Sequence, residues 1–268
     1  STGKCYVLLV DDIPQTSGYG EPVQRRLAFA DGEQIVGVVS QDPRNLPEYV
    51  PEFEEEEAEA DPGEAVPAEE LGGTDEFAPE IATVESEESA EAEEAEEAEE
   101  AEEVLGPLAV AISRHGKGLL FPLSVHAEPS TRNGRRFMSV NSAKGDGVVS
   151  VQLLTGPEAR VALATEKGRV LLFRAEQLKL LRRSGKGVNA IRIGKKDAVL
   201  DFKVCIRPSE SLEVETSRGR RILVWERKYS LTRRGGKGIE AIKLGALVAL
   251  PRPPQVIDPL RGEAEPDE

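Results

Sequence analysis

The stretch LTRRGGKGIEAIKLG, residues 231–245, has a near copy 51 residues earlier, LLRRSGKGVNAIRIG at residues 180–194. In both copies a pair of arginines precedes a glycine-rich turn with a central lysine, and an Ala-Ile pair follows it. Similarity to itself at a fixed spacing is typical of repeat proteins, in which each copy is one structural unit. The number of copies therefore decides the fold.

Two glycine landmarks recur along the chain. The first is a glycine followed by a basic residue, at Gly3-Lys4, Gly116-Lys117, Gly168-Arg169 and Gly219-Arg220. The second follows 17 or 18 residues later, at Gly20, Gly134, Gly185 and Gly236. The first interval becomes comparable to the others once an acidic segment, residues 51–103, is set aside. The sequence therefore contains four copies of one unit.

Each copy has the pattern of β-structure. RVALATEKGRVLLF, residues 160–173, alternates an apolar run, a polar turn with glycine and a second apolar run, which is typical of a β-hairpin. VNAIRIG and DAVLDFKVC, residues 188–194 and 197–205, predict two further strands. Four strands in about 51 residues indicate a propeller blade, and the 3.6-residue periodicity of helical repeats is missing.

We therefore expect an all-β fold, a β-pinwheel or propeller-like disc of about four four-stranded blades with a disordered acidic insertion. The predicted blades are residues 1–50, 104–155, 156–206 and 207–250. The insertion is residues 51–103, and an acidic tail covers residues 251–268.

The formal charge of −15 conceals a basic body. Residues 51–103 hold 25 of the 49 acidic residues and none of the 34 basic ones. The remainder is therefore basic, which points to nucleic acid or another polyanion as the partner. The insertion is either an inert spacer or a mimic of DNA charge that competes for the basic body.

Other classes of site lack support in the sequence. Cys5 and Cys205 have no metal or redox spacing, which predicts unpaired thiols in a reducing cytoplasm. His115 and His126 are too isolated for a metal site, and no phosphate-binding loop is present. No apolar run approaches the roughly 18 residues of a membrane span, and no signal peptide is evident.

With these motifs, residues 1–50 and 104–250 resemble the C-terminal β-pinwheel domain of the A subunit of bacterial DNA gyrase, or the same domain of the related topoisomerase IV. Arg233-Arg234-Gly235-Gly236-Lys237-Gly238 is similar to the box with which gyrase wraps DNA, although Thr232 stands where the family has Gln. The resemblance implies exchange of strands between neighbouring blades. It also implies a cytoplasmic bacterial enzyme acting at the nucleoid, not at a membrane.

The same resemblance implies an ATP-dependent type IIA topoisomerase that uses magnesium. Its implied partners are the ATPase B subunit and the N-terminal part of the A subunit (A2B2). No cofactor is expected in this segment. The four tyrosines, Tyr6, Tyr19, Tyr49 and Tyr229, are not in a catalytic context, so no catalytic residue is expected either.

The predicted ligand is double-stranded DNA, bound without sequence specificity around a basic rim. Glycines in the rim loops are expected to let the backbone approach phosphate and to leave N–H groups facing outward. The predicted DNA-binding residues are Arg233, Arg234, Gly235, Gly236, Lys237, Gly238, Arg182, Arg183, Lys186, Arg132, Arg135, Arg136, Lys4, Lys117, Arg169 and Arg220.

Two alternatives to gyrase-like wrapping remain open. The domain could capture a DNA segment without strong wrapping, as in topoisomerase IV. It could also be a propeller that serves as a protein-interaction platform, with the basic rim docking an acidic partner.

Overall fold

The computed structural model describes residues 1–47 except 16 and 19, and residues 106–250 except 157. The predicted acidic insertion and acidic tail lie outside these described residues. Regular structure in the described part consists of β-strands and three-residue 3-10 turns, so the all-β prediction is confirmed.

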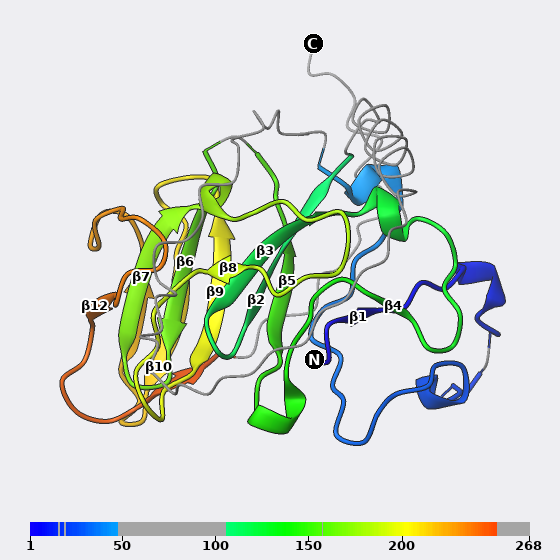
Figure 1. Cartoon of the computed structure of the whole chain (residues 1–268), viewed down its shortest axis with the longest axis horizontal. Helices are drawn as coiled ribbons and strands as arrows, with labels where there is room; N and C mark the ends of the chain where they lie inside the picture. Colours follow the sequence, from blue (N-terminus) through cyan, green and yellow to red (C-terminus); the bar gives the residue numbers. More distant parts are fainter. Residues whose placement is uncertain (16, 19, 48–105, 157, 251–268) are drawn as a thin grey trace, which may run out of the picture. The chain divides into compact units, whose positions relative to one another are not determined.

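The second and third repeats each form a four-stranded antiparallel sheet (Figure 1). In the second repeat the order is β5-β2-β3-β8, made of Val148–Leu153, Leu108–Ser113, Lys117–Pro122 and Val188–Asn189. In the third repeat the order is β9-β6-β7-β12, made of Val199–Cys205, Arg160–Thr165, Arg169–Arg174 and Ile239–Glu240.

One strand of each of these sheets comes from the next repeat. β8 belongs by sequence to the third repeat but pairs with β3 of the second, and β12 of the fourth repeat pairs with β7 of the third. β4 (Arg135–Arg136) of the second repeat likewise pairs with β1 (Lys4–Cys5) of the first. The exchange of strands implied by the family resemblance is therefore present at three successive junctions.

The two outer sheets have fewer strands than expected. The fourth repeat has three, in the order β13-β10-β11, made of Leu247–Ala249, Leu212–Thr216 and Arg221–Val224. Within the described residues, β11 receives no strand from a later repeat. Among the described residues of the first repeat, the one strand is β1, which pairs with β4.

The burial of each strand depends on whether neighbouring repeats cover its sheet. β2 and β6 are buried along nearly their whole length, because neighbouring repeats cover both faces of their sheets. One apolar cluster joins the third sheet to the fourth, and another joins the second sheet to the first repeat. β11 instead alternates exposed and buried residues, as expected for a sheet with one covered face.

The hairpin turns repeat in detail. A buried or half-buried hydroxyl of the first strand accepts a hydrogen bond from the amide four residues later, at the basic residue that follows the glycine. The pairs are Ser113 with Lys117 (3.3 Å), Thr165 with Arg169 (3.1 Å) and Thr216 with Arg220 (3.0 Å). The basic residues that follow the turn glycines therefore have equivalent backbone positions in successive sheets.

Candidate nucleic-acid interface

Three basic loops, residues 131–136, 182–187 and 233–238, occupy equivalent places between successive repeats. Each loop leads into an exchanged strand, β4, β8 or β12. Each also accepts a backbone hydrogen bond from the preceding repeat, and the three donor–acceptor pairs are Ala28 N to Arg132 O (2.8 Å), Ser139 N to Gly185 O (2.8 Å) and Arg192 N to Gly236 O (2.9 Å). The sequence places these acceptors 53 and 51 residues apart. The loops are therefore held in one repeating relationship to the sheets.

Eight basic side chains of these loops are exposed. We call this set the basic row: Arg132, Arg136, Arg182, Arg183, Lys186, Arg233, Arg234 and Lys237. Exposed cations spaced once per repeat present a series of positive charges to a long polyanion. The structure thus brings most of the predicted DNA-binding residues into one repeated arrangement.

Three basic residues of the hairpin turns pair with the exchanged strands into which these loops lead. Lys4 is the partner of Arg136 in the register of β1 and β4, Lys117 of Asn189, and Arg169 of Glu240. Lys4, Lys117 and Arg169 are half-buried, so they border the basic row rather than extend it. Arg220 is exposed, and it precedes β11, which has no exchanged strand among the described residues.

The loop at residues 232–238 is held by the third repeat. The amide and the hydroxyl of Thr232 donate to the carbonyl of Leu172, at 2.8 and 3.2 Å. The amide of Arg234 donates to Oε1 of Gln177 at 2.8 Å, and the amide of Gly235 donates to the carbonyl of Ala190 at 2.8 Å. The prediction of outward-facing N–H groups is therefore wrong for Arg234 and Gly235, because the protein itself uses these donors.

Glycines of this loop serve the packing of the chain. Gly238 has a φ of 71°, and a Cβ there would lie 2.8 Å from the carbonyl oxygen of Val170. Gly235 has a φ of 75°, a left-handed conformation that glycine adopts without strain. Contact with β7 and with the third repeat thus accounts for these two glycines without a phosphate.

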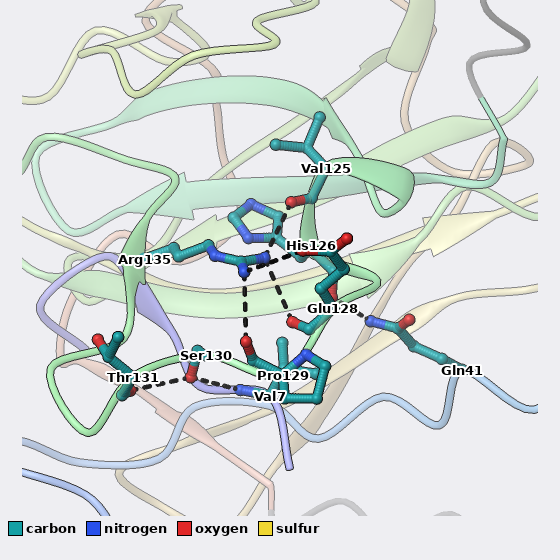
Figure 2. A network of polar contacts seen from close by, with 9 residues as sticks. All are labelled: Val7, Gln41, Val125, His126, Glu128, Pro129, Ser130, Thr131 and Arg135. Carbon is teal, nitrogen blue, oxygen red and sulfur yellow. Dashed lines mark hydrogen bonds and ion pairs between the residues drawn. The ribbon is translucent and has the colours of Figure 1, made fainter. Parts of the chain in front are cut away.

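Arg135 makes several contacts within its own repeat (Figure 2). Its guanidinium donates to the carbonyl oxygens of Val125, Glu128 and Pro129, at 3.4, 3.2 and 3.2 Å, and lies 3.9 Å from a carboxylate oxygen of Glu128. Most of its donors therefore hold the turn that precedes the first basic loop. Its place in DNA binding stays a prediction, with few N–H groups left for phosphate.

His126 sits in the same network and was not predicted to be structural. Its ring packs edge-on against Phe121 at 5.7 Å between centroids. Gln41 Nε2 donates to the carbonyl oxygen of His126 at 2.6 Å (Figure 2). Burial, and to a smaller extent the charge of Arg135, lowers the pKa of the His126 imidazole from its usual value. A neutral histidine here avoids a second positive charge beside the guanidinium.

Gln177 and Gln41 were also missed by sequence reasoning, because neither belongs to a repeated motif and both act through contacts between repeats. Cys5 and Cys205 form no disulfide within the described residues. Within residues 1–47 and 106–250, no cluster of histidine, cysteine and carboxylate side chains has the composition of a metal site. No helix in this described part is long and apolar enough to cross a membrane.

Comparison with known proteins gives a consistent result. The family model "DNA gyrase C-terminal domain, beta-propeller" matches residues 159–206 and 216–247. The A subunit of DNA gyrase from Mycolicibacterium smegmatis is 34% identical over 125 residues, which are 44% of this chain and 14% of that protein. The same protein of Staphylococcus epidermidis is 31% identical over 112 residues, 41% of this chain and 12% of the relative.

The matched segment is therefore a small part of those gyrase proteins. A solved C-terminal domain of DNA topoisomerase IV aligns with 53% of this chain and 44% of its own, at a TM-score of 0.47 and 18% identity. The resemblance inferred from the repeated motifs is confirmed at the level of sequence by the family match in the third and fourth repeats. In its third and fourth repeats, the chain is therefore similar to the DNA gyrase C-terminal domain, a β-propeller.

Proposed function

We propose that this chain binds double-stranded DNA as the C-terminal domain of the A subunit of a type IIA topoisomerase, with the basic row as its contact surface. The observation that carries the proposal is the repetition of exposed arginines and lysines in three loops joined to the sheets by equivalent hydrogen bonds. DNA carries regularly spaced phosphates, and a row of cations at a regular spacing neutralises several of them at once.

The proposed binding does not depend on base sequence. Recognition of bases in the major groove requires a helix or a β-ribbon that enters the groove. The described residues contain no α-helix, and the basic row consists of loops. Contacts from arginine and lysine to phosphates position DNA without reading its sequence.

The proposal includes wrapping of DNA around the domain, in addition to binding. Bending a duplex of 20–30 base pairs costs about 1–6 kcal/mol, and phosphate contacts distributed around a curved surface offset that cost. The basic row continues across three junctions between repeats, which supports a path for DNA along the repeats. In the full enzyme, this domain would hold DNA while ATP and Mg²⁺ are used by parts outside this chain.

One observation favours the alternative of a protein-interaction platform. Val10 and Val38 of the first repeat are 81% and 83% exposed, and Leu9, Ile13 and Ile35 are also exposed. Exposed apolar side chains that form one contiguous patch are typical of protein contacts. The basic row, however, consists of charged side chains, and a row of positive charges supports DNA as the principal ligand.

The direct test is binding to a fluorescent duplex at several salt concentrations, beside an acidic protein of similar net charge. We expect affinity for the duplex to fall linearly on logarithmic axes as salt rises, with a slope of about 0.9 for each phosphate neutralised. A steeper salt dependence with the acidic protein than with DNA would support the interaction platform. Absence of duplex binding at low salt would reject the proposed function.

A further inference from the structure

The loop that carries Arg233 and Arg234 receives a side chain from a different repeat. Oε1 of Gln177 accepts a hydrogen bond from the amide of Arg234 at 2.8 Å. Gln177 has no charge, and its Oε1 is used by the loop itself. We propose that Gln177 is a positioning residue, which holds the backbone between the two arginines so that both face DNA. This proposal rests on the proposed function.

Gln177 is held firmly enough for such a role. It ends a 3-10 turn, Ala175–Gln177, directly after β7. The first residue of this turn and the residue that follows it are buried, Ala175 at 1% exposure and Leu178 at 2%. The amide of Ala175 donates to the carbonyl of Ala159 and that of Leu178 to the carbonyl of Ala175, at 2.8 and 2.9 Å. The glutamine side chain therefore projects from a fixed part of the third blade.

The other acceptors that the third repeat offers to this loop belong to the backbone. They are the carbonyl oxygens of Leu172, Ala190 and Asn189, the last of which accepts from Nη1 of Arg234 at 3.3 Å. A substitution at position 177 would leave all three in place. A substitution of Gln177 therefore removes one acceptor and leaves the backbone acceptors in place. We expect this loss to free the amide of Arg234 without unfolding the loop.

The second repeat does not supply this brace at the position equivalent to Gln177. In the second repeat, the amide of Leu123 donates to the carbonyl of Pro107, matching Ala175 and Ala159 at an offset of 52 residues. The residue equivalent to Gln177 is therefore Val125, whose side chain has no acceptor. The loop with the arginine pair most similar to the gyrase box thus has a side-chain brace that the second repeat does not supply at this position.

The consequence for binding is a matter of preorganisation. An arginine on a fixed backbone loses less conformational freedom when it meets a phosphate than an arginine on a mobile loop. Removing the brace takes away no positive charge, yet it lowers the fraction of molecules in which both arginines face DNA. We expect Gln177→Ala to weaken duplex binding about three- to tenfold, in the range of one lost hydrogen bond.

The experiment compares the full chain carrying Gln177→Ala with a matched variant, Gln152→Ala. Gln152 also joins two repeats, since its amide group donates to the carbonyl of Phe202 and accepts from the amide of Val204, at 2.6 and 3.0 Å. It lies in β5, outside the basic row. Both variants remove a glutamine that links repeats, but only one of them contacts a basic loop.

Two readouts are required for each variant. Hydrogen exchange at the amide of Arg234 reports the brace itself, without DNA. The slope of log affinity against log salt for a duplex reports the number of phosphates neutralised. Gln177→Ala should speed exchange at Arg234 and lower the slope by about one. Gln152→Ala should leave both unchanged even if it lowers thermal stability. Gln177→Glu retains an acceptor and should keep the slow exchange of the unchanged protein.

Unchanged exchange in Gln177→Ala, or faster exchange with an unchanged salt slope, would overturn the proposal. Equal effects of Gln177→Ala and Gln152→Ala on the slope would overturn it as well, because they would reveal a general loss of structure. If the unchanged chain does not bind duplex, the proposed function fails, and hydrogen exchange still decides whether Gln177 holds the loop.

Discussion

The amide of Ala190 donates a hydrogen bond to the carbonyl oxygen of Gly116, 2.8 Å away, although the two residues belong to different repeats. The amide of Ala241 makes the equivalent bond to Gly168 at the next junction, also at 2.8 Å. The glycine of each of these two hairpin turns thus turns the chain and accepts a hydrogen bond from the following repeat. We expect the joining of these repeats to depend on the glycines, because their neighbours leave little space for a side chain.

Gly116 and Gly219 form a matched pair for testing this dependence. Their φ angles are 78° and 80°, so alanine is strained at both positions by about 1–2 kcal/mol. A Cβ at Gly116 would lie 2.5 Å from the carbonyl oxygen of Ile191, whereas at Gly219 the nearest atom is Oε1 of Glu215 at 3.7 Å. Gly116→Ala should lower the free energy of unfolding by about 1–3 kcal/mol more than Gly219→Ala, measured in urea. Equal losses would show that the junction does not need glycine.

The basic row can be tested with variants of equal charge. Arg233→Ala combined with Arg234→Ala removes two cations from the row. Lys203→Ala combined with Arg207→Ala removes two cations, one within β9 and one just after it, at the edge of the third sheet opposite β12. The first pair should lower the salt slope of duplex binding by about 0.9 for each phosphate that is no longer neutralised, and the second pair should leave it unchanged. Similar slopes for both double variants would mean that net charge alone drives binding.

The buried imidazole of His126 predicts a pH dependence of stability. Its pKa is lower in the folded protein than the ordinary value of 6.5, chiefly because of burial. The unfolded chain therefore binds the proton more readily, and the free energy of unfolding should fall as pH drops below about 6.5. The third repeat has a buried leucine, Leu178, at the equivalent position, so His126→Leu should weaken this dependence. His115→Gln, a change of the exposed histidine, is the control and should retain it.

Described residues on both sides of the acidic insertion contact the segment that precedes the first basic loop. Gln41, before the insertion, donates to the carbonyl of His126, and Pro107, after it, accepts from the amide of Leu123 at 2.9 Å. The turn at residues 124–126 lies a few residues before Arg132. We predict that the 25 acidic residues of this segment compete with DNA for the basic row, because they are joined to the chain on both sides.

Deletion of residues 51–103 should therefore tighten duplex binding, and most strongly at low salt, where charges interact over the longest range. A matched variant with the acidic residues of this segment replaced by serine and glutamine keeps the tether and removes the charge. It should bind as tightly as the deletion. Unchanged affinity in both would identify the insertion as an inert spacer.

The repeat, the hairpins and the all-β class could be predicted because they follow from local patterns, such as the hydroxyl of Thr165, the turn at Gly168 and the strands beside it. The strand order could not be predicted from these patterns. β8 and β12 contribute only two residues each, too few for a periodic signal, and their partners lie in the preceding repeat.

The site residues were likewise predictable where the signal is local and not where it depends on contacts in the fold. Charge and repetition identified Arg182, Arg233 and their neighbours as exposed cations, because both properties are visible in the sequence. They could not separate Arg136, which is exposed, from Arg135, whose guanidinium is occupied by backbone carbonyls. Adjacent arginines differ here because neighbouring residues of a strand point to opposite faces of the sheet.

The most direct test of the central claim is topological. Nicked plasmid is sealed by ligase with increasing amounts of the full chain, and the linking number is read after the protein is removed. The account predicts a progressive shift of one sign with protein dose, which is reduced in the Arg233→Ala, Arg234→Ala double variant. Tight duplex binding with no shift in linking number would contradict wrapping and leave capture of a DNA segment as the function.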